Sequence, residues 1–328
     1  MKFAIIGCGL IGNKRAATMP EGALAVACDA DISRAEALAK RFPGCVATTD
    51  LLAALSRDDV GAALICTPNH LLASIGLEAL RHGKHILVEK PAGICFEEVE
   101  ELALTAQAVN LKARVGFNHR YHPAFLKARE IFDSGILGPL MHIRARYGHG
   151  GRTGYDREWR ANPALSGGGE LIDQGVHLID LSRWFLGDFA SVEGHATTSF
   201  WDMEVDDNAF LSLRTATGQT AWLHASCTEW KNLFSFEIFG RDGKLQIDGL
   251  GGSYGTERLT FYKMLPQMGP PETTCWEYPR GDESWACEIS EFLRDIAEDR
   301  NPSPSLTDAA KALEIVRTIC RKSGKPAP

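Results

Sequence analysis

Hydrophobic positions in the first third of the chain fall into short runs separated by amphipathic stretches. The runs "KFAIIG", "ALAVAC", "AALICT", "HILVE" and "ARVGF" have the length and composition of buried strands. Between them, apolar residues recur at helical spacing over 32–42, 70–83 and 96–110. This alternation predicts a parallel sheet with crossover helices.

A different pattern begins at about residue 121. A helical segment at 123–134 leads to the strand "LMHIRARY", a loop rich in glycine and arginine at 148–168, and a helix at 169–186. Alternation in "DDNAFLSLRT", "AWLHASCTEW", "LFSFEIFG" and "GKLQIDG" predicts a large, mainly antiparallel open sheet. Helices are predicted at 285–299 and 306–321. We therefore expect an α/β protein with a first domain at 1–120 and a second at 121–328.

Composition and charge exclude several classes of protein. The 328 residues are 45% hydrophobic and 23% charged, which is typical of a globular protein. A net charge of -7 argues against binding to nucleic acid or to a membrane surface. Apolar runs are too short for a membrane helix and no signal sequence precedes the first strand, so we expect a cytoplasmic protein. The nine cysteines are scattered without a C-x-x-C pair, which indicates neither disulfides nor a metal site.

A glycine-rich motif follows the first predicted strand. "GCGLIG" contains Gly7, Gly9 and Gly12 at G-x-G-x-x-G spacing, with Leu10 and Ile11 at the start of the next helix. Such glycines allow a tight turn, the approach of a pyrophosphate, and close packing of helix and strand. The helix N-terminus then binds the anion, so the motif predicts a dinucleotide site.

The residue after the second strand indicates which dinucleotide binds. A carboxylate at Asp29 can accept hydrogen bonds from both ribose hydroxyls of an adenosine and repels a 2′-phosphate. Ala30 supplies no arginine for such a phosphate, although Arg34 lies nearby. The pattern predicts NAD as the cofactor and makes NADP less favoured.

Polar residues also follow the next two strands. "CTPNH" puts Thr67, Pro68 and Asn69 at the carboxyl edge, where open α/β sheets bind ligands, although an ordinary proline turn has the same composition. "VEKP" puts Glu89 and Lys90 at the same edge. A partly desolvated lysine there can hydrogen-bond a reacting oxygen and help to move its proton. Taken alone, "EKP" is more often a solvated turn.

The stretch "LIDQGVHLID" keeps polar residues in a segment that is otherwise apolar. Asp173, His177 and Asp180 fall in one narrow stripe of the predicted helix. A carboxylate four residues before a histidine can hold the imidazole and set its tautomer, so His177 is a candidate general base. A satisfied Asp–His pair in the core is the more common explanation of this spacing alone. Asp180 is a candidate support for the pair or a partner of another buried group.

Several of these segments together resemble one enzyme family. "GCGLIG", "CTPNH", "GKHILVEKP", "VGFNHRYHPAF" and "SGGGELIDQGVHLIDLSRWFLGD" are similar to motifs of the Gfo/Idh/MocA family of NAD(P)-dependent oxidoreductases, over nearly the whole chain. The resemblance implies a Rossmann domain followed by an α/β domain whose open sheet often forms the interface of a homodimer or homotetramer. It also implies a catalytic set of Lys90, Asp173 and His177. Leu72 departs from the family, whose members often carry histidine there.

Candidate substrate contacts lie before the polar helix. Five arginines occur between residues 144 and 160, and Arg152, Tyr155, Trp159 and Arg160 could close over a sugar, including an anionic one. Subunit contacts and surface ion pairs explain the same composition equally well. Asn118, after the last strand of the first domain, is a further candidate.

These observations predict a NAD-dependent oxidoreductase that transfers hydride between a secondary hydroxyl or ketone of a sugar, cyclitol or sugar derivative and the nicotinamide. Lys90 and His177 are expected to handle the proton. Two alternatives are an NAD-dependent glycosidase that oxidises its sugar transiently and a non-enzymatic NAD-binding sensor. The complete set of Lys90, Asp173 and His177 argues against the sensor.

Overall fold

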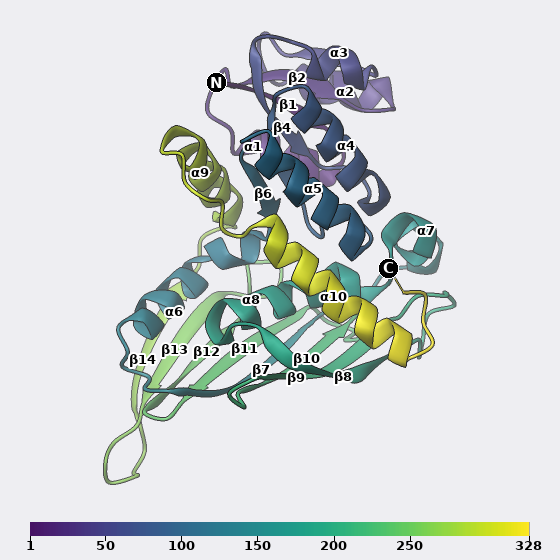
Figure 1. Ribbon diagram of the computed structural model, residues 1–328. Coiled ribbons are helices and arrows are strands. Elements are labelled where there is room, and N and C mark those ends of the chain that lie inside the picture. Colours follow the sequence, from purple (N-terminus) through teal and green to yellow (C-terminus); the bar gives the residue numbers. More distant parts are fainter. Residues whose placement is uncertain (328) are drawn as a thin grey trace. The chain divides into compact units, whose positions relative to one another are not determined.

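The computed structural model describes residues 1–327, and its two sheets belong to two compact units of the chain (Figure 1). One unit comprises Met1–Phe117 and Trp285–Lys311. The other comprises Asn118–Ser284 and the residues from Ala312 onward. The predicted α/β class, with one parallel and one mainly antiparallel sheet, is confirmed.

The first unit is built on a six-stranded parallel sheet in the order β3-β2-β1-β4-β5-β6. Its central strands are buried at nearly every position, as expected when helices cover both faces of a parallel sheet. The chain order reverses between β1 and β4, which is where doubly wound sheets bind ligands. The strands are β1 (Lys2–Ile6), β2 (Leu24–Cys28), β3 (Val46–Thr48), β4 (Val60–Ile65), β5 (His85–Glu89) and β6 (Ala113–Gly116), and the helices are α1 (Leu10–Ala17), α2 (Ile32–Ala39), α3 (Leu51–Leu55), α4 (Asn69–Arg81), α5 (Phe96–Ala108) and most of α9 (Ser284–Ala297).

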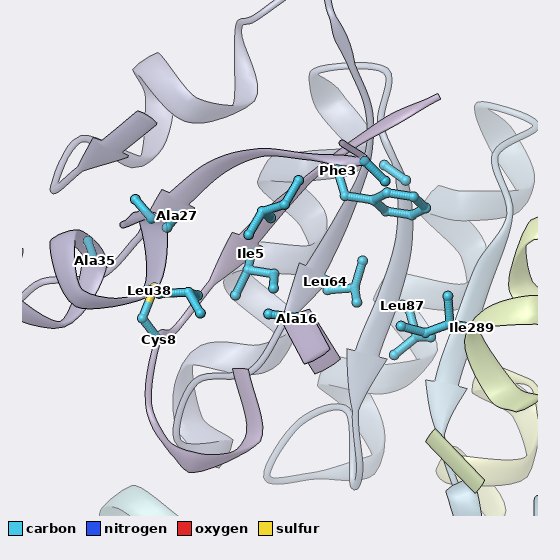
Figure 2. Close-up of a cluster of buried hydrophobic side chains, with 14 of the residues drawn as sticks. Phe3, Ile5, Cys8, Ala16, Ala27, Ala35, Leu38, Leu64, Leu87 and Ile289 are labelled. Carbon is cyan, nitrogen blue, oxygen red and sulfur yellow. The ribbon is translucent and has the colours of Figure 1, made fainter. Parts of the chain in front are cut away.

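The core of the first unit includes a helix from the far end of the sequence. Ile289 and Phe292 of α9 belong to the same buried cluster as Phe3, Leu64 and Leu87 of the sheet (Figure 2). The sequence pattern places everything after residue 120 in a second domain, and the structure corrects this for 285–311. Helical periodicity identifies α9, but it contains no information about which sheet the helix covers.

The second unit is built on an eight-stranded sheet in the order β14-β13-β12-β11-β7-β10-β9-β8. Neighbouring strands are antiparallel except β7 and β10, which are parallel. Burial alternates along the strands, so one face of the sheet is apolar. The strands are β7 (Leu140–Gly148), β8 (Phe189–Thr197), β9 (Asn208–Thr215), β10 (Thr220–Ser226), β11 (Leu233–Gly240), β12 (Gly243–Asp248), β13 (Glu257–Lys263) and β14 (Glu272–Tyr278).

Helices cover one face of this second sheet. α6 (Pro123–Asp133) packs on β12, β13 and β14, and α8 (Val176–Leu186) packs on β7 and β10. The last turn of α10 (Leu306–Lys322) reaches β8, where Lys322 Nζ donates a hydrogen bond of 2.8 Å to the Val192 carbonyl. In Figure 1 the opposite face of the sheet carries no helix among the residues described for this unit.

Three further features bear on the site. All nine cysteines are free thiols. Within residues 1–327, no cluster of three or more His, Cys, Asp or Glu side chains is placed to hold a metal ion. No helix in this range is both long enough and apolar enough to cross a membrane.

Candidate functional site

The glycine motif forms the turn between β1 and α1 at the carboxyl edge of the parallel sheet. The Gly7 amide donates a 2.8 Å hydrogen bond to the Cys28 carbonyl, which ties the turn to the end of β2. A Cβ on Gly12 would lie 2.0 Å from the Gly7 carbonyl oxygen, so only glycine lets α1 start this close to the turn. A Cβ on Gly9 would meet nothing within 4 Å. That open backbone surface, beside the first turn of α1 with Leu10 and Ile11, fits a pyrophosphate.

Asp29 lies directly after β2 and contacts the same turn. Its Oδ2 accepts a 2.7 Å hydrogen bond from the Cys8 amide, and its Oδ1 accepts one of 2.9 Å from the Asp31 amide. Arg34 lies 3.5 Å from the Asp31 carboxylate, with both side chains exposed. This edge therefore presents two carboxylates and an arginine that already has an acidic partner, an arrangement that suits ribose hydroxyls better than a 2′-phosphate.

The end of β4 lies beside the glycine turn. The Cys66 amide donates a 2.7 Å hydrogen bond to the Ile6 carbonyl, which brings Thr67 to the same edge. The hydroxyl of Thr67 is buried and has no hydrogen-bond partner among residues 1–327. Pro68 precedes α4, and Asn69 is the first residue of that helix and is buried.

The end of β5 carries the predicted catalytic lysine. Lys90 follows Glu89 directly, is partly exposed, and is joined to Pro91 by a cis peptide bond. The Glu89 carboxylate is buried and accepts a 2.7 Å hydrogen bond from Arg15 Nε. The two side chains thus have different surroundings, because Glu89 is buried and Lys90 is partly exposed.

In the second unit, Asp173 and His177 lie on either side of a change in helix type. Leu171–Gly175 forms a π-helix (η4), and α8 begins at Val176. The sequence pattern predicts one α-helix over 169–186, and the structure corrects this. A wider π-turn changes the angle between residues four apart, and such turns are frequent at functional sites. Periodicity did not reveal it, because apolar residues surround the segment on most sides.

Asp206 fixes the start of the π-helix. Its Oδ1 accepts a 3.1 Å hydrogen bond from the Gly169 amide, and its Oδ2 accepts one of 2.8 Å from the Leu171 amide. Burial raises the pKa of Asp206 to about 6, and these backbone hydrogen bonds act in the opposite direction. Asp206 therefore satisfies amide groups at a helix start that would otherwise be buried without partners.

Asp180, the last residue of the polar stripe, pairs with Arg120. Arg120 Nε donates a hydrogen bond of 2.8 Å to Asp180 Oδ2, and its Nη2 donates one of 2.5 Å to Oδ1. Both side chains are buried. This bidentate pair fixes the short helix η1 (Asn118–Tyr121) against α8.

The short helix η1 also contains His119, whose ring stacks on that of His177, the predicted general base. The imidazoles of His119 and His177 lie 3.7 Å apart between centroids, at an interplanar angle of 23°. Tyr147 of β7 contacts both rings, with its centroid 5.2 Å from His119 and 6.2 Å from His177. Asn118 is buried and donates a 2.8 Å hydrogen bond from Nδ2 to the Ser284 hydroxyl. The sequence indicated none of the contacts of His119.

The predicted substrate arginines contact carboxylates of the chain. Arg160 Nε donates a 3.2 Å hydrogen bond to Asp173 Oδ2, and the guanidinium lies 4.6 Å from the centre of the Trp159 ring. Arg152 Nη2 donates one of 2.6 Å to Glu158 Oε2. The structure thus brings Arg160 to the predicted catalytic carboxylate, and it places Arg152 at the exposed surface.

Glu170, a buried acid beside these residues, is not indicated by the sequence pattern. Glu170 is almost fully buried and accepts a 2.6 Å hydrogen bond from the Tyr155 hydroxyl. His149 Nε2 lies 3.4 Å from the same carboxylate oxygen. Burial lowers the pKa of His149, but its hydrogen bond to Glu170 and the charges of Glu170 and Asp173 leave that pKa raised. A glutamate next to a glycine run gives no local signal of this network.

Comparison with known families assigns the fold. The family model described as "Oxidoreductase family, NAD-binding Rossmann fold" matches residues 1–117, and the model "GFO/IDH/MocA C-terminal domain" matches residues 125–246. The chain belongs to the Gfo/Idh/MocA family. It is thus an oxidoreductase with the NAD-binding Rossmann fold of that family, as the motifs predict.

Relatives of this Gfo/Idh/MocA protein align over most of its length. Inositol 2-dehydrogenase of Rhizobium meliloti is 27% identical, with 98% of each chain covered. Levoglucosan dehydrogenase of Pseudarthrobacter phenanthrenivorans is 25% identical, over 92% of this chain and 87% of the relative. A solved structure of levoglucosan dehydrogenase in complex with NADH and levoglucosan superposes with a TM-score of 0.86 at 24% identity, covering 100% of this chain and 98% of that one. At this identity the superposition shows the shared fold.

The Arg120–Asp180 pair allows a direct test of what holds η1 against α8 in this family member. Asp180→Asn should lower the free energy of unfolding by about 3 kcal/mol, because it removes the counter-charge of a buried guanidinium. Urea denaturation measures the change. Asp133→Asn is the control, because it weakens a more exposed 2.9 Å pair with Arg129 at the end of α6. The control should cost about 0.5 kcal/mol or less, and equal losses in the two variants would contradict the role of Asp180.

Proposed function

We propose that this oxidoreductase transfers hydride between NAD and a secondary hydroxyl, or the corresponding ketone, of a neutral sugar or cyclitol. The observation that carries the proposal is the carboxyl edge of the parallel sheet. Neighbouring strands β2, β1, β4 and β5 end there in Asp29, the glycine turn, Thr67 and Lys90. The names of the relatives, levoglucosan dehydrogenase and inositol 2-dehydrogenase, support a hydroxyl-rich substrate.

The residues of this edge suit NAD. The backbone of Gly7, Gly9, Leu10, Ile11 and Gly12 would hold the pyrophosphate, and Asp29 would bind the adenosine ribose. Thr67, Pro68, Asn69, Glu89 and Lys90 would follow along the same edge. When bound, NAD supplies the acceptor for the hydride.

The side chains handle the proton. His177 takes the proton of the substrate hydroxyl as the carbon-bound hydrogen leaves as hydride, and Lys90 donates a hydrogen bond to the same oxygen. In the reverse direction His177 returns the proton to the ketone oxygen. Asp173 stabilises the protonated imidazole through its negative charge.

The substrate is proposed to be uncharged because of the arginine contacts. Arg152 and Arg160 face Glu158 and Asp173, so each positive charge is already compensated within the chain. Polyol hydroxyls can donate to the carboxylates and accept from the arginines without separating these pairs. Tyr155, Trp159 and Asn118 complete the set of proposed substrate contacts.

A panel of sugars, sugar acids, cyclitols and nucleotide sugars, followed by nicotinamide absorbance, tests the proposal. Net formation of NADH from a neutral polyol is the expected result. Release of an aglycone without net NADH would identify the glycosidase alternative. Cofactor binding without turnover of any compound would identify the sensor.

The proton-handling roles predict a non-additive pair of variants. His177→Ala and Lys90→Ala should each lower kcat by about 100-fold or more, with NAD affinity close to wild type. Because both groups are proposed to act on one oxygen, the double variant should lose much less than the product of the single losses. Steady-state kinetics and cofactor titration measure both effects.

His82→Ala, at the C-terminal end of α4, is a control that should retain wild-type kcat. Wild-type turnover in both single variants would remove these residues from the mechanism. Fully multiplicative losses would argue against a shared oxygen.

Selection against NADP should depend on the charge of Asp29. Asp29→Ala should raise the ratio of kcat/KM for NADP to that for NAD by about tenfold or more, because a repulsive carboxylate is lost. Asp29→Asn keeps the shape and should shift the ratio in the same direction. Asp59→Asn, on the exposed surface, should leave it unchanged. A constant ratio in the Asp29 variants would assign cofactor choice to another residue.

We also propose that copies of the chain associate through the open face of the eight-stranded sheet, and that the protein works in the cytoplasm. Aromatic side chains support association, since Trp222 is 64% exposed there and the rings of His195, Phe210 and His224 form a stacked row. Nine scattered free thiols suit a reducing compartment.

This association predicts that Trp222→Glu lowers the molecular mass measured by sedimentation equilibrium, because it places a charge in an apolar contact. Met268→Glu adds the same charge at an exposed loop residue and should leave the mass unchanged. A monomeric wild-type protein at micromolar concentration would refute the interface.

A further inference from the structure

A buried group of charges lies beneath the carboxyl edge of the parallel sheet, and of its members only Glu89 belongs to the edge proposed to bind NAD. The group consists of Arg15 of α1, Glu89 at the end of β5 and Glu288 of α9, and we refer to it as the buried triad. Arg15 Nη2 lies 2.7 Å from Glu89 Oε1, and Arg15 Nη1 lies 2.5 Å from Glu288 Oε2. The side chains of Arg15 and Glu288 are 0% exposed, and that of Glu89 is 9% exposed.

Elements of the first unit enclose the triad. The ring of Trp285 lies 4.5 Å from the guanidinium carbon of Arg15. A Cβ on Gly116, at the end of β6, would lie 2.7 Å from Arg15 Nη2 and 3.0 Å from a Glu89 oxygen. Water is therefore excluded, and charges in the triad are weakly screened.

The charged groups that act on Glu288 come from three elements, α1, β5 and β6. Burial raises the pKa of Glu288 to about 7, while the charges of Arg15 and Arg114 lower it and that of Glu89 raises it. Burial and Glu89 also hold the pKa of the Cys66 thiol well above its usual range, so the thiol stays neutral. Glu288 is thus a member of the group whose charge changes near neutral pH.

We propose that the buried triad makes the cofactor site selective for the oxidised form, with Glu288 as the residue that sets this preference. The inference rests on the proposed function, because it takes NAD and NADH as ligands of this edge. NAD carries a positive charge on its nicotinamide and NADH does not. With Glu288 ionised, two carboxylates face one guanidinium, and the excess negative charge attracts the oxidised form more strongly.

Glu89 connects the buried triad to the carboxyl edge of the parallel sheet, where the reaction is proposed to occur. It is the last residue of β5 and directly precedes Lys90, so the charge lies behind the strand end where the lysine is presented. Glu288 lies on α9, which comes from the C-terminal part of the sequence. Ile289 and Phe292 of the same helix pack in the core of the first unit. Glu288 is therefore a positioning residue that acts through an electrostatic field and touches no substrate.

Ionisation of Glu288 predicts the direction in which the preference for NAD changes with pH. Below pH of about 7, Glu288 binds a proton, and the triad loses its excess negative charge. As the pH rises through this range, affinity for NAD should increase relative to affinity for NADH. We expect the ratio of the dissociation constant of NADH to that of NAD to rise about fivefold between about pH 6 and about pH 8.5.

Equilibrium titration of NAD and NADH, each as a separate probe at both pH values, tests this in the wild type, in Glu288→Gln and in Glu298→Gln. Glu288→Gln keeps the shape but cannot ionise, so its ratio should stay at the low-pH value of the wild type. Glu298 lies after α9 in an exposed pair with Arg300, so Glu298→Gln should behave as the wild type does. Loss of a purely structural support would weaken both forms of the cofactor equally and leave the ratio unchanged.

The outcomes separate the inference from the proposed function. If neither form of the cofactor binds, the proposed function fails. If both bind and the wild-type ratio does not change with pH, the triad has no such role, and this measurement does not require that Glu288→Gln fold. A ratio that still rises with pH in Glu288→Gln would also overturn the inference.

Discussion

Parallel pairing of β1 with β2 and β4 is the constraint from which the cofactor edge follows. Strands that run in one direction end at one edge, and here the backbone hydrogen bonds continue past the strands into the turns. The Gly7 amide reaches the carbonyl at the end of β2, and the Cys66 amide reaches the carbonyl at the end of β1. Polar residues from separate parts of the sequence thus become neighbours through backbone pairing alone.

The second unit holds the acids near its predicted base by giving each a partner from another segment. Asp180 pairs with Arg120, Asp173 with Arg160, and Glu170 with the Tyr155 hydroxyl. A buried charge without such a partner would destabilise the fold. The consequence for function is a fixed environment around His177, whose ring is stacked by His119 and bordered by Tyr147.

The sequence predicts the parts of this molecule that local patterns encode. Hydrophobic periodicity gave both sheets and most helices, and glycine spacing gave the turn after β1. Local patterns could not predict that α9 packs in the core of the first unit, because the strand residues that share a cluster with Phe292 lie more than two hundred residues away in sequence. The Arg120–Asp180 pair and the π-helix also depend on packing between segments. Local spacing suggested that the stripe in α8 needed a polar partner, but not which residue supplies it.

Charge compensation within the chain argues against inferring an anionic substrate from the local excess of arginine. In sequence, the segment 144–160 looks basic, but in the structure three of its five arginines pair with acids: Arg144 with Glu237, Arg152 with Glu158, and Arg160 with Asp173. An anionic ligand would have to compete with these carboxylates and would leave an acid without its partner. A neutral polyol has no such cost, because each hydroxyl can both donate and accept. The same acids that stabilise the loop therefore support the proposal of an uncharged substrate.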